Sequence, residues 1–122
     1  MKLLIRRGTS VENVKKSFSN CYPFLKIELY KAVIDGQLTH LKKESLPSNL
    51  AFDKLIKNSD ETVIDIGKAI TVAELENQFA NIGLGAEVFR KSGTVWIETS
   101  LTDNWTLQQQ NTEAEELDLH FN

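Results

Sequence analysis

Apolar residues recur along this chain with two different periods, which predict where strands and helices lie. Residues 25–32 are apolar at every second position, which is typical of a half-buried strand. Residues 11–21 and 72–82 are apolar at spacings of three and four, which is typical of a helix that packs one face on a core. Each helix should therefore bury one stripe of side chains. The first stripe contains Val11, Val14, Phe18 and Cys21, and the second contains Val72, Leu75, Phe79 and Ile82.

Polar residues and a proline predict where these helices begin and end. Thr9 with Glu12, and Thr71 with Glu74, have the spacing of a capping box, in which two side chains satisfy backbone N–H groups at a helix start. Pro23 disfavours the helical conformation of the residue before it, so the first helix should end there.

Turn residues predict further strands. Asp35-Gly36 is a tight-turn dipeptide, so Leu38–Leu41 should return antiparallel to the preceding strand. The turn at 91–94 should join strands Ala86–Arg90 and Val95–Thr99. Other patterns predict strands at 2–5 and 63–66, a short helix opened by Ser48, and a helical turn or two opened by Thr106 with Gln109.

The two halves of the chain are loosely similar, over residues 2–57 and 62–111. Each half follows the order strand, helix, strand, strand, short helix, which predicts an α+β fold with a mainly antiparallel or mixed sheet and helices on one face. A unit of about 60 residues is marginal alone, so residues 1–122 should form a single pseudo-twofold domain. The alignment matches Leu3 with Ile64, Phe18 with Phe79, Glu28 with Glu87, and Tyr30 with Phe89.

The end of the chain is acidic. Residues 112–122 contain four acidic side chains, and this composition predicts a frayed tail. The alternative is an added edge strand through Leu117, Leu119 and Phe121.

The charge is distributed unevenly, although the whole chain carries a formal net charge of only −3. Residues 1–60 contain 11 Lys and Arg against 6 Asp and Glu, whereas residues 61–122 contain 3 against 11. A basic half can form a nucleic-acid surface beside an acidic segment. The alternative is that the two halves complement each other, within one chain or between copies.

The compartment is predicted from the absence of targeting features in the sequence. The start, MKLLIRRG, has too short an apolar run for a signal-peptide core, and no run approaches the roughly 20 apolar residues that span a bilayer. One cysteine cannot form an internal disulfide bond. We therefore expect a cytoplasmic protein without a membrane partner.

The second half resembles a family of small uncharacterised bacterial proteins. The resemblance covers a helix (TVAELENQF), a turn with the strand after it (VFRKSGTVWIETS) and a following segment (DNWTLQQQN). It implies a self-contained bacterial domain. Because no activity, cofactor or partner is known for that family, it assigns no functional residues.

The sequence contains no catalytic or metal-binding motif that we recognise. His40 and His120 are not spaced with cysteine as metal ligands are, and Cys21 lies in an apolar stripe, where a buried small hydrophobe is expected. Strand glutamates that face water account for the acidic positions Glu28, Glu87 and Glu98, which should share one face of the sheet. We predict no catalytic residue, no metal and no cofactor.

Aromatic and basic residues on one face of the sheet predict a binding surface. Aromatic side chains on an open sheet can stack on bases while lysine and arginine meet phosphates. Alternatively, they form the core of a second layer or a homodimer interface, where aromatics are enriched. The predicted surface consists of Tyr30, Phe89, Trp96, Lys26, Arg90 and Lys91.

These patterns favour a non-enzymatic protein-interaction module that self-associates or binds another protein. The alternative is a nucleic-acid-binding domain that uses the basic first half, with Lys15, Lys16, Lys42 and Lys43 facing phosphates. An enzyme whose site forms only between subunits is a third hypothesis.

Overall fold

The computed structural model describes residues 1–34, 41–52 and 61–121, and it has the predicted α+β class. The order strand, helix, strand, strand occurs twice and is followed by a C-terminal helix. The elements are β1 (Lys2–Arg6), α1 (Val11–Cys21), β2 (Leu25–Ile34), β3 (Leu41–Ser45), β4 (Glu61–Asp65), α2 (Val72–Ala80), β5 (Leu84–Ser92), β6 (Val95–Glu98), the 3-10 helix η2 (Ser100–Thr102) and α3 (Leu107–Phe121).

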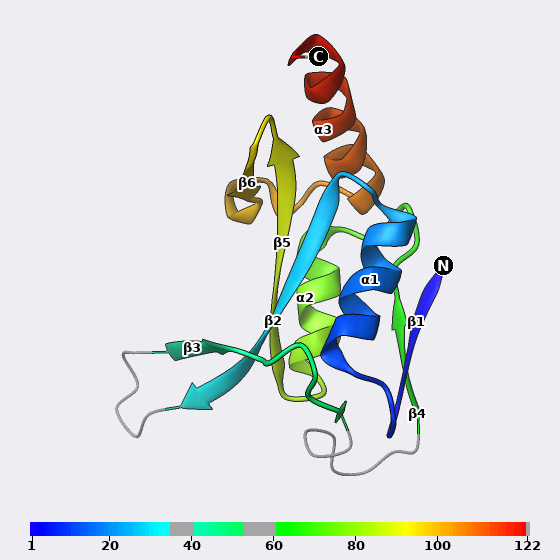
Figure 1. Cartoon of the computed structure of the whole chain (residues 1–122), viewed down its shortest axis with the longest axis vertical. Coiled ribbons are helices and arrows are strands. Elements are labelled where there is room, and N and C mark those ends of the chain that lie inside the picture. The colour runs from blue at the N-terminus through cyan, green and yellow to red at the C-terminus, as the bar shows by residue number, and fades with distance from the viewer. Residues whose placement is uncertain (35–40, 53–60, 122) are drawn as a thin grey trace.

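The strands form two antiparallel sheets. β1 and β4 pair as a two-stranded ribbon, and the other four strands form a sheet in the order β3-β2-β5-β6. Helix α1 packs on β2 and β1, whereas α2 packs on β5 and β4. The two helices therefore lie between the ribbon and the four-stranded sheet, and they cover one face of that sheet (Figure 1).

One hydrophobic core joins both sheets to both helices. The long strands alternate as predicted, so that Leu25, Ile27 and Leu29 of β2 are buried while the residues between them are half-buried. Phe18 of α1 and Phe79 of α2 are fully buried in the same cluster. No helix in the described ranges is long and apolar enough to cross a membrane.

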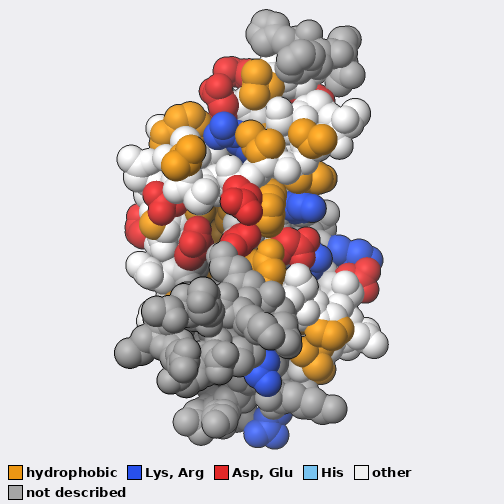
Figure 2. Space-filling view, turned by 90° about the vertical axis from the view of Figure 1, so that its left-hand side faces the viewer, with side chains coloured by type: hydrophobic (Ala, Val, Ile, Leu, Met, Phe, Trp, Pro, Cys, Tyr) orange, Lys and Arg blue, Asp and Glu red, His pale blue; other side chains and the backbone are white. Residues whose placement is uncertain are grey.

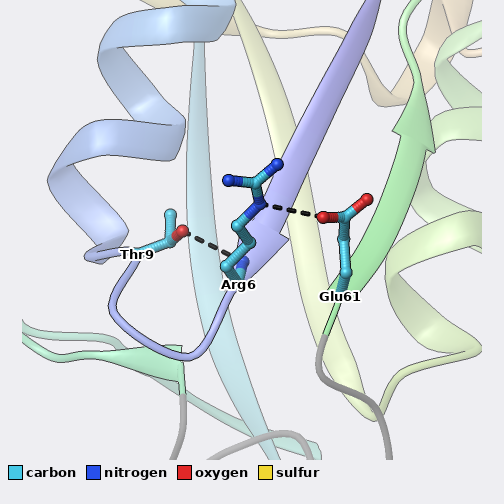
Figure 3. A network of polar contacts seen from close by, with 3 residues as sticks. All are labelled: Arg6, Thr9 and Glu61. Carbon is cyan, nitrogen blue, oxygen red and sulfur yellow. Dashed lines mark hydrogen bonds and ion pairs between the residues drawn. The ribbon is translucent and has the colours of Figure 1, made fainter.

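The ribbon brings the basic start of the chain against the acidic start of its second half. Lys2 stands opposite Asp65, and Arg6 stands opposite Glu61. The Arg6 Nε donates to a Glu61 carboxylate oxygen at 2.8 Å, across two strands that are far apart in the sequence (Figure 3). Part of the charge asymmetry is therefore neutralised within the chain. Because both side chains are exposed, such a pair stabilises the fold only weakly.

The two predicted capping boxes have different outcomes. At α2 the box forms, since the Thr71 hydroxyl accepts from the Glu74 N–H and the Glu74 carboxylate accepts from the Thr71 N–H. The predicted box of Thr9 with Glu12 is wrong. The Thr9 hydroxyl instead accepts from the Arg6 N–H at 3.0 Å and closes the turn after β1 (Figure 3), and Ser10 caps α1.

The end of the first helical stripe also differs from the prediction. Cys21, expected to be buried, is exposed. Tyr22 is buried in its place with 1% of its surface exposed, and its hydroxyl donates to the Ile66 carbonyl at 2.6 Å. Cys21 and Tyr22 lie three and four residues after Phe18, and both spacings fit a helical stripe. The tyrosine is the larger of the two, and its ring packs on Phe18 with 5.6 Å between ring centroids.

Two segments of the first half correspond only in part to the prediction. Strand β3 begins at Leu41, so most of the predicted strand Leu38–Leu41 lies outside the described residues. The helix predicted from Ser48 is wrong at its start, because residues 48–49 form a turn and Ala51 forms an isolated bridge with Ser10. Its remainder, from residue 53, lies outside the described residues.

The acidic end of the chain is a helix, so both the frayed tail and the edge strand are wrong over residues 112–121. Helix α3 begins with a reciprocal cap, in which Thr106 and Gln109 each accept the other's backbone N–H. Leu107 and Ala114 are fully buried, and the Asn111 side chain accepts from the Phe24 N–H at 2.9 Å. These contacts supply the tertiary packing that stabilises a short helix.

Candidate functional site

The candidate site is the face of the four-stranded sheet that points away from α1 and α2, here called the open face. Alternation along β2 and β5 places the residues between the buried positions on this face, and cross-strand pairing extends it to β6. The open face contains Lys26, Glu28 and Tyr30 of β2, Glu87, Phe89 and Lys91 of β5, and Trp96 and Glu98 of β6.

One lysine and two aromatic rings lie together on the open face. We call this group the aromatic cluster, and it consists of Lys26, Phe89 and Trp96. The Lys26 Nζ lies 5.3 Å from the centroid of the Phe89 ring and 5.2 Å from that of Trp96. An ammonium group at such distances is attracted to the face of each ring. Trp96 nevertheless remains 39% exposed. The structure thus brings together three of the six residues in the predicted binding surface.

Acidic side chains cross the middle of the open face. Glu28 and Glu87 stand directly opposite each other on β2 and β5, and Glu98 is the cross-strand neighbour of Phe89. Seen from the side of β6, the molecule shows Asp and Glu side chains gathered across its middle (Figure 2). Like charges that face each other across strands are unfavourable. The Lys15 Nζ offsets this repulsion by pairing with Glu28 at 3.0 Å.

Tyr30, another residue of the predicted surface, lies beside these carboxylates. Its hydroxyl donates to a Glu87 carboxylate oxygen at 3.5 Å, which is a long hydrogen bond. Burial raises the pKa of Tyr30, and the negative charges of Glu87, Glu28 and Glu98 raise it further. The tyrosine therefore stays protonated well above neutral pH. In the described part of the chain, no group of three or more His, Cys, Asp or Glu side chains is arranged to hold a metal ion.

Arg90 was predicted on this surface, but it lies on the opposite face of the sheet. It pairs with the buried Leu25, its guanidinium lies 5.4 Å from the Trp105 ring centroid, and its Nη1 donates to the Gln110 side chain at 3.0 Å. The fully buried Gln110 in turn donates to the Thr102 carbonyl at 2.7 Å. Sequence reasoning missed this polar network because it did not extend α3 onto the sheet.

Other basic residues on the predicted surfaces are also paired. Lys91 lies on the open face but reaches Asp118 of α3 at 3.9 Å. Lys16 pairs with Glu12 at 3.1 Å, one turn away on α1. The side chains of Lys42 and Lys43 lie outside the described residues. The lysines of α1 therefore face acidic partners, which reduces the positive charge available to phosphates.

A pocket of about 440 Å³ adjoins the acidic side chains at the border of the sheet. It extends from the open face around the edge of β5 to the C-terminal half of α2. No pattern in the sequence predicts this pocket, because its position depends on where β6 stops pairing with β5. The lining residues are Tyr30, Lys31, Glu76, Asn77, Ala80, residues 84–88, Glu98, Thr99 and Ser100.

The open face thus presents an aromatic cluster, with Trp96 exposed, beside a row of carboxylates. The resemblance of the second half to small bacterial proteins stays a prediction. In the comparisons with protein families, curated proteins and solved structures, nothing matches this chain.

Proposed function

We propose that this chain is a non-enzymatic interaction module that self-associates through the aromatic cluster of Lys26, Phe89 and Trp96. The observation that carries the proposal is the exposure of Trp96, 39% of its surface, on a sheet face that α1 and α2 leave uncovered. Tryptophan, tyrosine and phenylalanine are enriched in protein interfaces, because they bury a large apolar area with few rotatable bonds.

The charges beside the cluster favour a contact between two identical copies. In a twofold interface each surface patch meets its own copy, so the patch must complement itself. Phe89 has Lys26 on one neighbouring strand and Glu98 on the other. A twofold axis that passes near Phe89 and runs parallel to the strands would place the lysine of one copy against the glutamate of the other. Such pairing would offset the cost of removing both charges from water.

We also propose that the domain arose by duplication and has an internal pseudo-twofold axis. The strand order β3-β2-β5-β6 is unchanged when the two halves are exchanged. Where a twofold axis passes through an antiparallel pair, the two residues that stand opposite each other at the axis are equivalent. Leu3 stands opposite Ile64 and Glu28 opposite Glu87, and these are the pairs that the sequence alignment equates. Two separate strand pairs therefore support the same axis.

Light scattering after size exclusion tests self-association. We expect the 13.8 kDa chain to elute as a dimer at micromolar concentration, and we expect Trp96→Ala and Phe89→Ala to weaken the dimer about tenfold or more, as loss of a central aromatic does. Leu4→Ala is the matched control, because Leu4 is 46% exposed on the ribbon, beyond the helices. A monomer at all concentrations, or an equal effect of the Leu4 variant, would refute the proposal.

A further inference from the structure

Strand β5 has an edge that faces away from β2, and none of the described strands pairs with the first half of this edge. β2 pairs with β5 along residues 84–90, but β6 pairs only with residues 89–92. Thr99 makes the last contact, since its N–H and its hydroxyl both donate to the Val88 carbonyl, at 3.3 and 2.8 Å. The chain then turns away from β5 into η2. Figure 1 shows β6 alongside only part of β5.

In the described part of the chain, the backbone groups on this edge that lack a partner strand belong to Leu84 and Ala86. In an antiparallel ladder, successive residues direct their N–H and C=O groups to opposite sides of the strand. The Val88 carbonyl bonds to Thr99 on the β6 side, whereas the Lys91 N–H bonds to Phe24 on the β2 side. Even-numbered residues of β5 therefore face the open edge. Within the described ranges, no strand pairs with Leu84 or Ala86 on that side.

The 440 Å³ pocket lies along this open edge and gives it two chemically different walls. The wall on the open face contains Tyr30 and the carboxylates of Glu87 and Glu98. The wall on the other face contains Leu84 and, from α2, Ala80. Among the lining residues that the structure describes are three glutamates and one lysine, so together they carry a negative formal charge.

We propose that this edge binds an extended peptide segment of another protein, in which lysine or arginine alternates with apolar residues. An added strand would bond to the backbone of Leu84 and Ala86, as extended peptides do at other open sheet edges. Side chains of a strand point alternately to its two faces. Basic side chains would therefore meet Glu87 and Glu98, while apolar side chains would meet Leu84 and Ala80.

The same charges argue against a second copy of this chain as the occupant. Pairing of two β5 edges would bring the carboxylates of both copies together, and such like-charge contacts oppose association. Glu98 borders both this edge and the aromatic cluster through which we propose self-association, but the backbone amides of Leu84 and Ala86 belong to the edge alone. The positions of the amide shifts therefore distinguish the two proposals.

The test uses the intact chain and a labelled hexapeptide of alternating valine and lysine, titrated by fluorescence anisotropy and by NMR of backbone amides. We expect saturable binding, with shifts at Leu84, Ala86 and Glu98 and slower hydrogen exchange at the Leu84 and Ala86 amides. Glu98→Lys should weaken binding about tenfold, whereas its matched control Glu115→Lys, on an exposed part of α3, should change it less than about twofold. The valine–glutamate hexapeptide should not bind.

Two N-methylated forms of the peptide distinguish strand addition from simple charge attraction. Successive N–H groups of a strand point to opposite sides, so only every second N–H of the bound peptide would face β5. Of the forms methylated at the odd or at the even residues, one should therefore lose binding and the other should still bind. The proposal is overturned if both forms bind equally, if Glu98→Lys and Glu115→Lys act alike, or if the shifts fall at Lys26 and Trp96. It is also overturned if the Leu84 and Ala86 amides are protected by self-association alone, since a second copy would then occupy the edge.

Discussion

Replacing Tyr22 with phenylalanine should remove a hydrogen bond that joins the two halves of the fold while keeping the ring. Tyr22 caps the C-terminus of α1, and its hydroxyl donates to the Ile66 carbonyl just after β4 at 2.6 Å. Both residues are buried, so the variant leaves a carbonyl oxygen without this partner and without water. An unsatisfied buried group of this kind costs about 1–3 kcal/mol of unfolding free energy. We expect Tyr22→Phe to lose that amount at pH 7.

The same hydroxyl should make the stability of the protein depend on alkaline pH. Burial raises the pKa of Tyr22 to about 12 from its ordinary value of 10.0, and the negative charges of Cys21 and Asp65 add to the shift. Since the pKa is raised in the folded state, the stabilisation is fully present below pH 10 and is lost as the pH rises toward 12. Raising the pKa from 10.0 to about 12 corresponds to about 2.7 kcal/mol of unfolding free energy, of which about 1.4 kcal/mol is lost by pH 11.

Urea unfolding of the wild type and of Tyr22→Phe, at several values of pH from 7 to 11.5, measures both effects. Other titrating groups are present in both proteins, so the difference between the two unfolding free energies isolates Tyr22. We expect that difference to be constant up to about pH 9.5 and then to shrink by about 1.4 kcal/mol at pH 11. A difference that stays constant to pH 11.5 would refute the reasoning on the buried hydroxyl. Equal stability at pH 7 would refute the importance of the hydrogen bond.

Three further predictions concern the repeat, a helix cap and nucleic acid. Phe18→Ala and Phe79→Ala should each cost about 3–5 kcal/mol in urea unfolding, because both rings are fully buried, and values that differ several-fold would argue against equivalent positions. Thr71→Ala should cost about 1 kcal/mol by removing the cap of α2, and Thr71→Ser should restore most of it. Fluorescence anisotropy at about 0.1 M salt should show no binding of labelled single-stranded RNA or DNA, because Lys15 is paired with Glu28; submicromolar binding would favour the nucleic-acid alternative.

The local pattern of the sequence was sufficient for much of the fold. Alternation in residues 25–32 predicted which side chains of β2 are buried, and helical spacing predicted the burial of Phe18 and Phe79. The capping box at Thr71 was also predicted correctly. These features follow from the periods of strands and helices and from short-range hydrogen bonds, which involve residues within a few positions of each other.

The local pattern was insufficient where two neighbouring residues could fill the same position. Cys21 and Tyr22 both continue the stripe from Phe18. The tyrosine is the buried one, and its hydroxyl bonds to the carbonyl of Ile66, 44 residues along the chain. Thr9 and Ser10 could both cap α1, and the turn after β1 uses Thr9. In each case a contact outside the helix decided between two locally equivalent choices.

Some features of the candidate site likewise follow from the sequence, whereas others depend on the tertiary structure. Strand alternation alone placed Tyr30, Phe89 and Trp96 on one face, because side chains of a strand point alternately to its two sides. The sequence could not determine that α3 packs against Arg90, nor that β6 stops at Thr99 and leaves the edge of β5 open. Those features depend on which distant segments meet and where their pairing ends, and such contacts leave no periodic signal in the chain.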